Sequence, residues 1–157
     1  MTALTPLVLI HVIAAGLVLV VGGAQILRPR RDAAHRWIGR SWIVVMIVVC
    51  TTSFFIHPHG FSWLHALAVW TLFAISMGFW RIRSGDVRGH RAWMIGTWLG
   101  TVIAFAFAVL TPARLLPRLL GSDPVALLAG AGGVVALSAA ICATIIGTTR
   151  APRRRGT

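Results

Sequence analysis

Five long apolar stretches, separated by short polar segments, dominate the hydrophobic pattern of the chain. They cover residues 4–27, 37–56, 61–80, 93–111 and 124–147. Each is close to the roughly 20 apolar residues that a helix needs to cross a hydrocarbon core of about 30 Å. The pattern therefore predicts an all-α membrane protein with five transmembrane helices. Because no basic residue precedes the first stretch, we interpret it as a membrane helix and not as a signal peptide.

The polar segments hold an uneven distribution of arginine, which is the only basic residue type besides histidine. Thirteen of the fifteen arginines fall on one side of the predicted helices: Arg28, Arg30, Arg31, Arg36 and Arg40, then Arg81, Arg83, Arg88 and Arg91, then Arg150, Arg153, Arg154 and Arg155. Short cytoplasmic loops carry an excess of Lys and Arg. We therefore expect the N-terminus outside the cell and the C-terminus in the cytoplasm.

Acidic residues are scarce, and this excludes several kinds of chemistry. Only Asp32, Asp86 and Asp123 are present, far apart in the sequence, against a formal net charge of +12. Glycosidases need a pair of carboxylates, and calcium sites need several. Because the arginines lie between membrane-length stretches, the positive charge indicates contact with membrane lipid and no nucleic-acid partner.

The first two stretches resemble the next two, which indicates a duplicated helical hairpin. Each copy has a histidine early in its first helix, His11 or His65, and an arginine-rich loop with one aspartate. Each then continues with a His-Arg pair, at His35 or His90, followed by two tryptophans. We predict one integral membrane domain over residues 1–157, with repeats at about 4–56 and 61–111 and an additional helix at about 124–147.

The repeat places four histidines in two pairs. In a four-helix bundle of two hairpins, helices one and three are diagonal, as are helices two and four, so His11 faces His65 and His35 faces His90. Opposed imidazoles can clamp a haem through both axial positions. We therefore predict two haem b groups, with iron ligands His11, His65, His35 and His90. Arginines near the histidines would pair with the haem propionates: Arg28, Arg36, Arg40, Arg83 and Arg91.

Other interpretations of these residues remain open. His35 and His90 begin predicted helices in basic segments, where histidine also caps helices or meets lipid headgroups. His57 and His59 flank a proline, and two ligands alone make a weak metal site. Tryptophans at the ends of the stretches, including Trp42 and Trp98, are typical of interface anchors. Three small residues, Ala15, Val18 and Gly22, lie on the same face as His11 and leave room there for a ring system.

Two sequence elements carry a resemblance to a known family. The first has a GGAQ stretch and then His35, Arg36, Gly39 and Arg40; the second has His90, Arg91, Trp93 and Met94. In this order they resemble the small bacterial membrane proteins of domain-of-unknown-function family 2306, over residues 9–109. The resemblance implies an integral protein of the bacterial cytoplasmic membrane and no particular activity. The paired histidines are more loosely similar to those of two-haem b-type membrane cytochromes.

These observations favour a b-type cytochrome-like electron carrier that exchanges electrons with quinone or with another membrane subunit. The second hypothesis is a haem-free accessory or scaffold subunit whose arginine loops bind anionic lipid or a partner complex. The third is a small transporter that uses His11 and His65 as proton carriers. It is the weakest, because the stretches contain no carboxylate.

Overall fold

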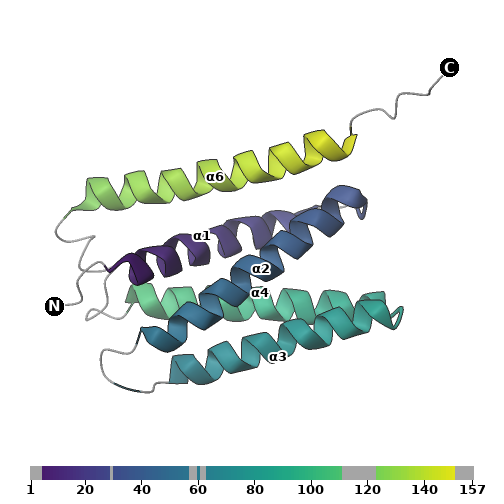
Figure 1. Ribbon diagram of the computed structural model, residues 1–157, viewed down its shortest axis with the longest axis horizontal. Coiled ribbons are helices and arrows are strands. Elements are labelled where there is room, and N and C mark those ends of the chain that lie inside the picture. Colours follow the sequence, from purple (N-terminus) through teal and green to yellow (C-terminus); the bar gives the residue numbers. More distant parts are fainter. Residues whose placement is uncertain (1–4, 29, 57–59, 61–62, 111–122, 151–157) are drawn as a thin grey trace.

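The computed structural model of the chain describes residues 5–28, 30–56, 60, 63–110 and 123–150, and its elements are helices (Figure 1). They are α1 (Pro6–Leu27), α2 (Ala33–Phe55), α3 (Trp63–Arg83), α4 (Val87–Leu110) and α6 (Pro124–Arg150). All five are long and apolar enough to cross a membrane. The predicted fold class is therefore confirmed: the chain is an all-α membrane protein.

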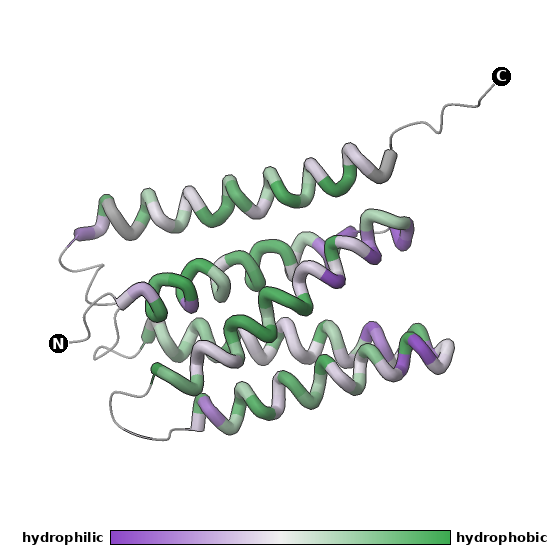
Figure 2. The backbone as a smooth tube through the Cα atoms, viewed as in Figure 1, coloured by the Kyte–Doolittle hydropathy of each residue, from purple (hydrophilic) through white to green (hydrophobic). Residues whose placement is uncertain are grey.

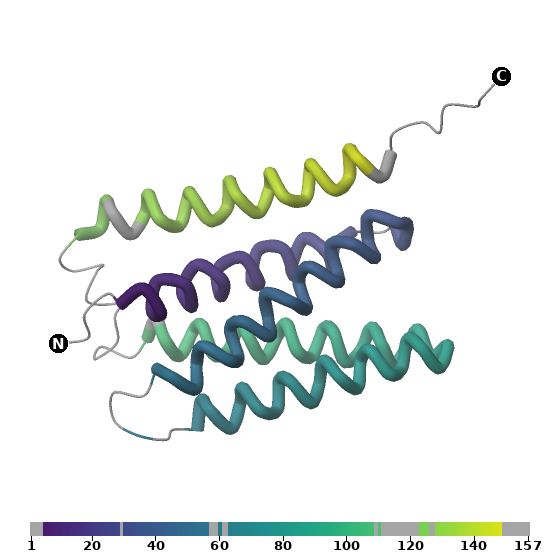
Figure 3. The backbone as a smooth tube through the Cα atoms, in the orientation of Figure 1, coloured from purple at the N-terminus to yellow at the C-terminus, as the bar shows by residue number. Residues whose placement is uncertain are grey.

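Helices α1 to α4 form a four-helix bundle in which each helix packs against the next and α4 closes on α1. In the part of the chain that the structure describes, α1 and α3 do not pack directly on each other, and neither do α2 and α4. These two pairs are therefore diagonal, as predicted. Helix α6 lies outside the bundle against α1 and α2 (Figures 1 and 3).

The bundle has two chemically different ends. We call the end that holds the α1–α2 and α3–α4 turns the arginine-rich end, and the end that holds Pro6, Phe55 and Trp63 the opposite end. Hydrophilic residues of α1 to α4 gather at the arginine-rich end, at the right of Figure 2. The helices between the two ends are largely apolar, as a lipid environment requires.

Two aspartates decide where the second helix of each hairpin begins. The carboxylate of Asp32 accepts a hydrogen bond from the His35 amide at 3.0 Å, and that of Asp86 accepts one from the Gly89 amide at 2.8 Å. Such capping satisfies amides that have no partner within the helix. Helices α2 and α4 therefore begin at Ala33 and Val87, ahead of the apolar stretches at 37 and 93. His35 and His90 lie in the first turns of these helices.

The space beside Gly22 is filled by tryptophan. A Cβ atom at Gly22 would lie 2.5 Å from Cδ1 of Trp98 and 2.6 Å from Nε1 of Trp42. Trp42 is buried, and its indole donates to the Val18 carbonyl, while that of Trp98 donates to the Leu19 carbonyl. Two tryptophans expected at the lipid interface thus pack inside the bundle, and the room expected beside Gly22 is occupied.

Candidate functional site

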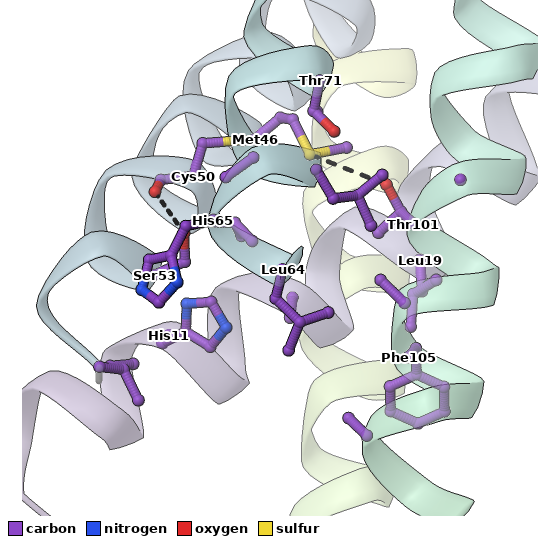
Figure 4. Close-up of a pocket in the computed structure, with 18 of the residues that line it drawn as sticks. His11, Leu19, Met46, Cys50, Ser53, Leu64, His65, Thr71, Thr101 and Phe105 are labelled. Carbon is purple, nitrogen blue, oxygen red and sulfur yellow. Dashed lines mark hydrogen bonds between the residues drawn. The ribbon is translucent and has the colours of Figure 1, made fainter. Parts of the chain in front are cut away.

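A cavity of about 220 Å³ lies inside the bundle toward the opposite end (Figure 4). All four bundle helices contribute to its lining, which is mostly apolar. Small residues, among them Ala15, Ala68, Gly100 and Ala104, keep it open. Two of its few polar groups are the imidazoles of His11 and His65, from the diagonal helices α1 and α3. The structure thus brings this predicted pair to one cavity.

A hydrogen bond to Thr52 of α2 fixes the orientation of the His11 ring. Nδ1 of His11 lies 2.8 Å from the Thr52 hydroxyl oxygen, which lies 2.7 Å from the Val48 carbonyl oxygen. A second carbonyl oxygen, that of Val49, lies 3.1 Å from the hydroxyl oxygen. A carbonyl can only accept, so the single hydroxyl proton of Thr52 is directed to these main-chain carbonyls. The hydroxyl oxygen then accepts from Nδ1–H of His11. In the neutral ring, the lone pair therefore resides on Nε2.

His65 is the more buried member of the pair, with 5% of its surface exposed. Its ring centroid lies 5.9 Å from that of Phe54, which comes from α2. An ionisable side chain at this depth of a membrane helix is costly and is usually retained for a function. Its position beside an internal cavity is consistent with such a function.

The second histidine pair lies at the arginine-rich end. The side-chain amide nitrogen of Gln25, from α1, lies 2.8 Å from Nδ1 of His35 and 2.7 Å from the His35 carbonyl oxygen. Nδ1 of His90 lies 2.8 Å from the Gly78 carbonyl oxygen of α3. The two imidazoles are close enough to interact electrostatically. All four bundle helices thus contribute to one polar layer.

Residues 8–146 match a family model described as "Predicted membrane protein (DUF2306)". The chain belongs to this family. The match begins next to the predicted start at residue 9 and extends past residue 109 through most of α6, so the fifth helix is part of the family architecture. No curated protein and no solved structure matches the chain.

The five arginines predicted to pair with propionates have different surroundings in this DUF2306 protein. Arg28 makes two hydrogen bonds of 2.8 Å to the Asp32 carboxylate and is engaged within the protein. Arg40 and Arg83 lie over the rings of Trp37 and Phe79, at 5.3 and 5.7 Å. Arg36 and Arg91 are exposed. His57 and His59 lie outside the described residues.

Two residues of the site were not predicted from the sequence. Thr52 orients His11, and Gln25 orients His35. Thr52 lies in an apolar stretch that contains other hydroxyl side chains, and no motif marks it. Gln25 was part of the GGAQ stretch used for the family resemblance. Gln25 is the only polar side chain in that stretch. A lone polar residue near the end of an apolar helix is a feature from which an internal hydrogen-bond partner could have been predicted.

Proposed function

We propose that this protein is a b-type cytochrome-like electron carrier that holds haem between His11 and His65. The observation that carries the proposal is that the two imidazoles come from diagonal helices and line one apolar cavity. A planar cofactor held across the centre of a bundle needs ligands from helices that do not pack on each other. The α1–α3 pair meets this requirement.

The donor set of the cavity suits haem iron. Two imidazoles are too few for a metal site built from protein ligands alone. They are the number that haem takes at its two axial positions. His11 offers Nε2 with its lone pair, because Nδ1–H is bound to Thr52. Metal-ligating histidines almost always donate their other ring N–H in this way.

The size of the cavity sets a condition on the proposal. Its volume of about 220 Å³ lies below the range of about 300–1,000 Å³ typical of pockets for drug-sized ligands. A porphyrin therefore enters only if the larger lining side chains move outward. Leu19, Leu64 and Phe105 are the clearest of these in Figure 4.

The residues of the chain supply position and environment, and the bound haem would supply reversible one-electron chemistry. His11 and His65 would hold the cofactor, Thr52 would keep His11 oriented, and the apolar lining would exclude water. Electron exchange with quinone or with another membrane subunit completes the proposal. The location in the cytoplasmic membrane, with the arginine-rich end in the cytoplasm, rests on the distribution of arginines.

The visible spectrum of the purified protein tests the haem. We expect a preparation in mild detergent to show a haem band that sharpens on reduction with dithionite. His11→Ala and His65→Ala should each abolish that band, because a single imidazole is left in the cavity. Ser76→Ala removes an exposed hydroxyl that bonds to the Leu72 carbonyl of its own helix; it is the matched control and should keep the band.

A colourless protein that takes up no haem on reconstitution would contradict the cytochrome proposal. The exposed arginines at one end would then favour the second candidate function, a haem-free accessory subunit. Arg36 and Arg91 are exposed there and could meet anionic headgroups or a partner complex. Binding of the colourless protein to vesicles containing phosphatidylglycerol, and not to neutral vesicles, would be the expected signature.

A further inference from the structure

We infer that the two histidine pairs are not equivalent, and that the chain takes one haem and not two. The inference rests on the proposed function for His11 and His65. It concerns the other pair, His35 and His90, which the hydrogen bonds of the structure arrange as one donor and one acceptor. The argument depends on which nitrogen of each ring carries the proton.

Gln25 and Arg31 both place a donor at Nδ1 of His35, Arg31 at 3.5 Å, and the closer contact with Gln25 shows where the ring proton lies. The amide nitrogen of Gln25 lies 2.7 Å from the His35 carbonyl oxygen, which can only accept a hydrogen bond. The atom of Gln25 at this place is therefore the NH₂ group, since an oxygen there would face another oxygen. The same NH₂ group lies 2.8 Å from Nδ1 of His35, so Nδ1 accepts. In the neutral ring the proton then resides on Nε2, the nitrogen that would have to bind iron.

His90 has the opposite arrangement. Its Nδ1 lies 2.8 Å from the Gly78 carbonyl oxygen, so Nδ1 carries the proton and Nε2 carries the lone pair. His90 thus resembles His11, whereas His35 does not. A bis-histidine clamp needs a lone pair on each facing nitrogen. The pair at the arginine-rich end instead offers one N–H and one lone pair.

Packing about two helical turns from this pair, and beside Gly78, also argues against a second macrocycle. Trp42 and Trp98 fill the space beside Gly22, and the side chain of Met94 occupies the place that a Cβ atom at Gly78 would take. These side chains are larger than the alanines and glycine that line the cavity at the opposite end. Small residues therefore play different structural roles at the two ends. Ala15, Ala68, Gly100 and Ala104 leave a cavity, whereas Gly22 and Gly78 leave space that tryptophan and methionine side chains fill.

The haem content of the purified protein tests this inference. We expect one haem per chain by pyridine haemochrome and protein quantification. His35→Ala and His90→Ala should each keep the full haem content, whereas His65→Ala should lose it. Two haems per chain, or loss of haem in His35→Ala, would overturn the inference. A protein with no haem would contradict the proposed function and the stoichiometry together.

The tautomer of His35 gives a readout that does not depend on haem. In apoprotein labelled with ¹⁵N-histidine, NMR distinguishes the protonated ring nitrogen from the unprotonated one. We expect Nε2–H for His35 and Nδ1–H for His11 and His90. Gln25→Leu combined with Arg31→Leu removes both donors that face Nδ1 of His35 and should shift His35 away from the Nε2–H form while leaving His11 unchanged. Nδ1–H on His35 in the wild-type protein would refute the asymmetry, whatever the haem content.

Discussion

The indole Nε1 of Trp42 donates a hydrogen bond of 2.9 Å to the main-chain carbonyl of Val18, and both residues are buried. The bond joins α2 to α1 at the centre of the bundle. It is possible because Gly22, one turn further along α1, has no side chain to hold the indole away. The approach of the two helices therefore depends on a residue that contributes no contact of its own.

Gly22→Ala is accordingly expected to destabilise the protein. The added methyl group would overlap Trp42 and Trp98, and overpacking of this kind typically costs about 1–3 kcal/mol. Thermal unfolding in detergent should show a lower midpoint. Gly96→Ala is the matched control, because a Cβ atom there meets nothing within 4 Å. Equal midpoints for the two variants would show that Trp42 and Trp98 can move to accommodate the methyl group at no cost in stability.

The Arg28–Asp32 ion pair predicts a dependence of stability on pH. The hydrogen bonds from Arg28 hold the pKa of Asp32 below its ordinary value of 3.8. A carboxyl group with a lowered pKa stabilises the fold above its ordinary pKa and loses this contribution as the pH falls below it. We expect the unfolding midpoint to fall between pH 4 and pH 2.

Asp32→Asn separates this ion pair from other effects of acid. Asparagine still caps a helix well, so α2 should form, but its side chain carries no charge to lose. The unfolding midpoint of the variant should start lower at pH 6 and change less between pH 4 and pH 2. Parallel curves for the variant and the wild-type protein would show that other groups cause the acid sensitivity.

Thr52 should affect haem affinity without touching the haem. Thr52→Val keeps the shape of the side chain but removes the hydroxyl that accepts from Nδ1 of His11. Loss of such an outer partner typically weakens metal binding about 10- to 100-fold. Haem titration of the apoprotein should show this loss for Thr52→Val and near wild-type affinity for Thr52→Ser. An unchanged affinity in Thr52→Val would remove Thr52 from the site.

The proposed orientation in the membrane can be tested with single cysteines. Thr5 and Ser84 are exposed at opposite ends of the bundle. In a background with Cys50 and Cys142 replaced by alanine, Thr5→Cys should react with a membrane-impermeant maleimide in spheroplasts. Ser84→Cys should react only after lysis. The reverse pattern would place the arginine-rich end outside the cell.

The number of helices could be predicted from the sequence because it follows from a strong, local requirement. Their pairing could be predicted because the sequence repeat indicated two hairpins. A backbone in lipid must satisfy its polar groups within the helix, so length and apolarity define the helices. The starts of α2 and α4 could not be found in this way. They depend on capping by Asp32 and Asp86, which lie outside the apolar stretches.

The details of the candidate site were less predictable. The spacing of the repeat predicted that His11 and His65 belong together, and they line one cavity. The same spacing made His35 and His90 look equivalent to them. What distinguishes His35 from His11 is the partner of its Nδ1 atom, an amide NH₂ for His35 and a hydroxyl for His11. Such partners depend on how neighbouring helices are rotated, which no spacing along one helix reveals.

The aspartates in the turns have a consequence for how the bundle is assembled. Arg28 and Asp32 are four residues apart, and Arg81 and Asp86 are five apart, so each ion pair closes within its own hairpin. Neither turn needs the other hairpin to neutralise its carboxylate. Each hairpin can therefore enter the bilayer with its connecting turn already complete. The pairing of α1 and α2 with α3 and α4 is then left to contacts inside the bundle, among them the hydrogen bond from the Trp98 indole to the Leu19 carbonyl.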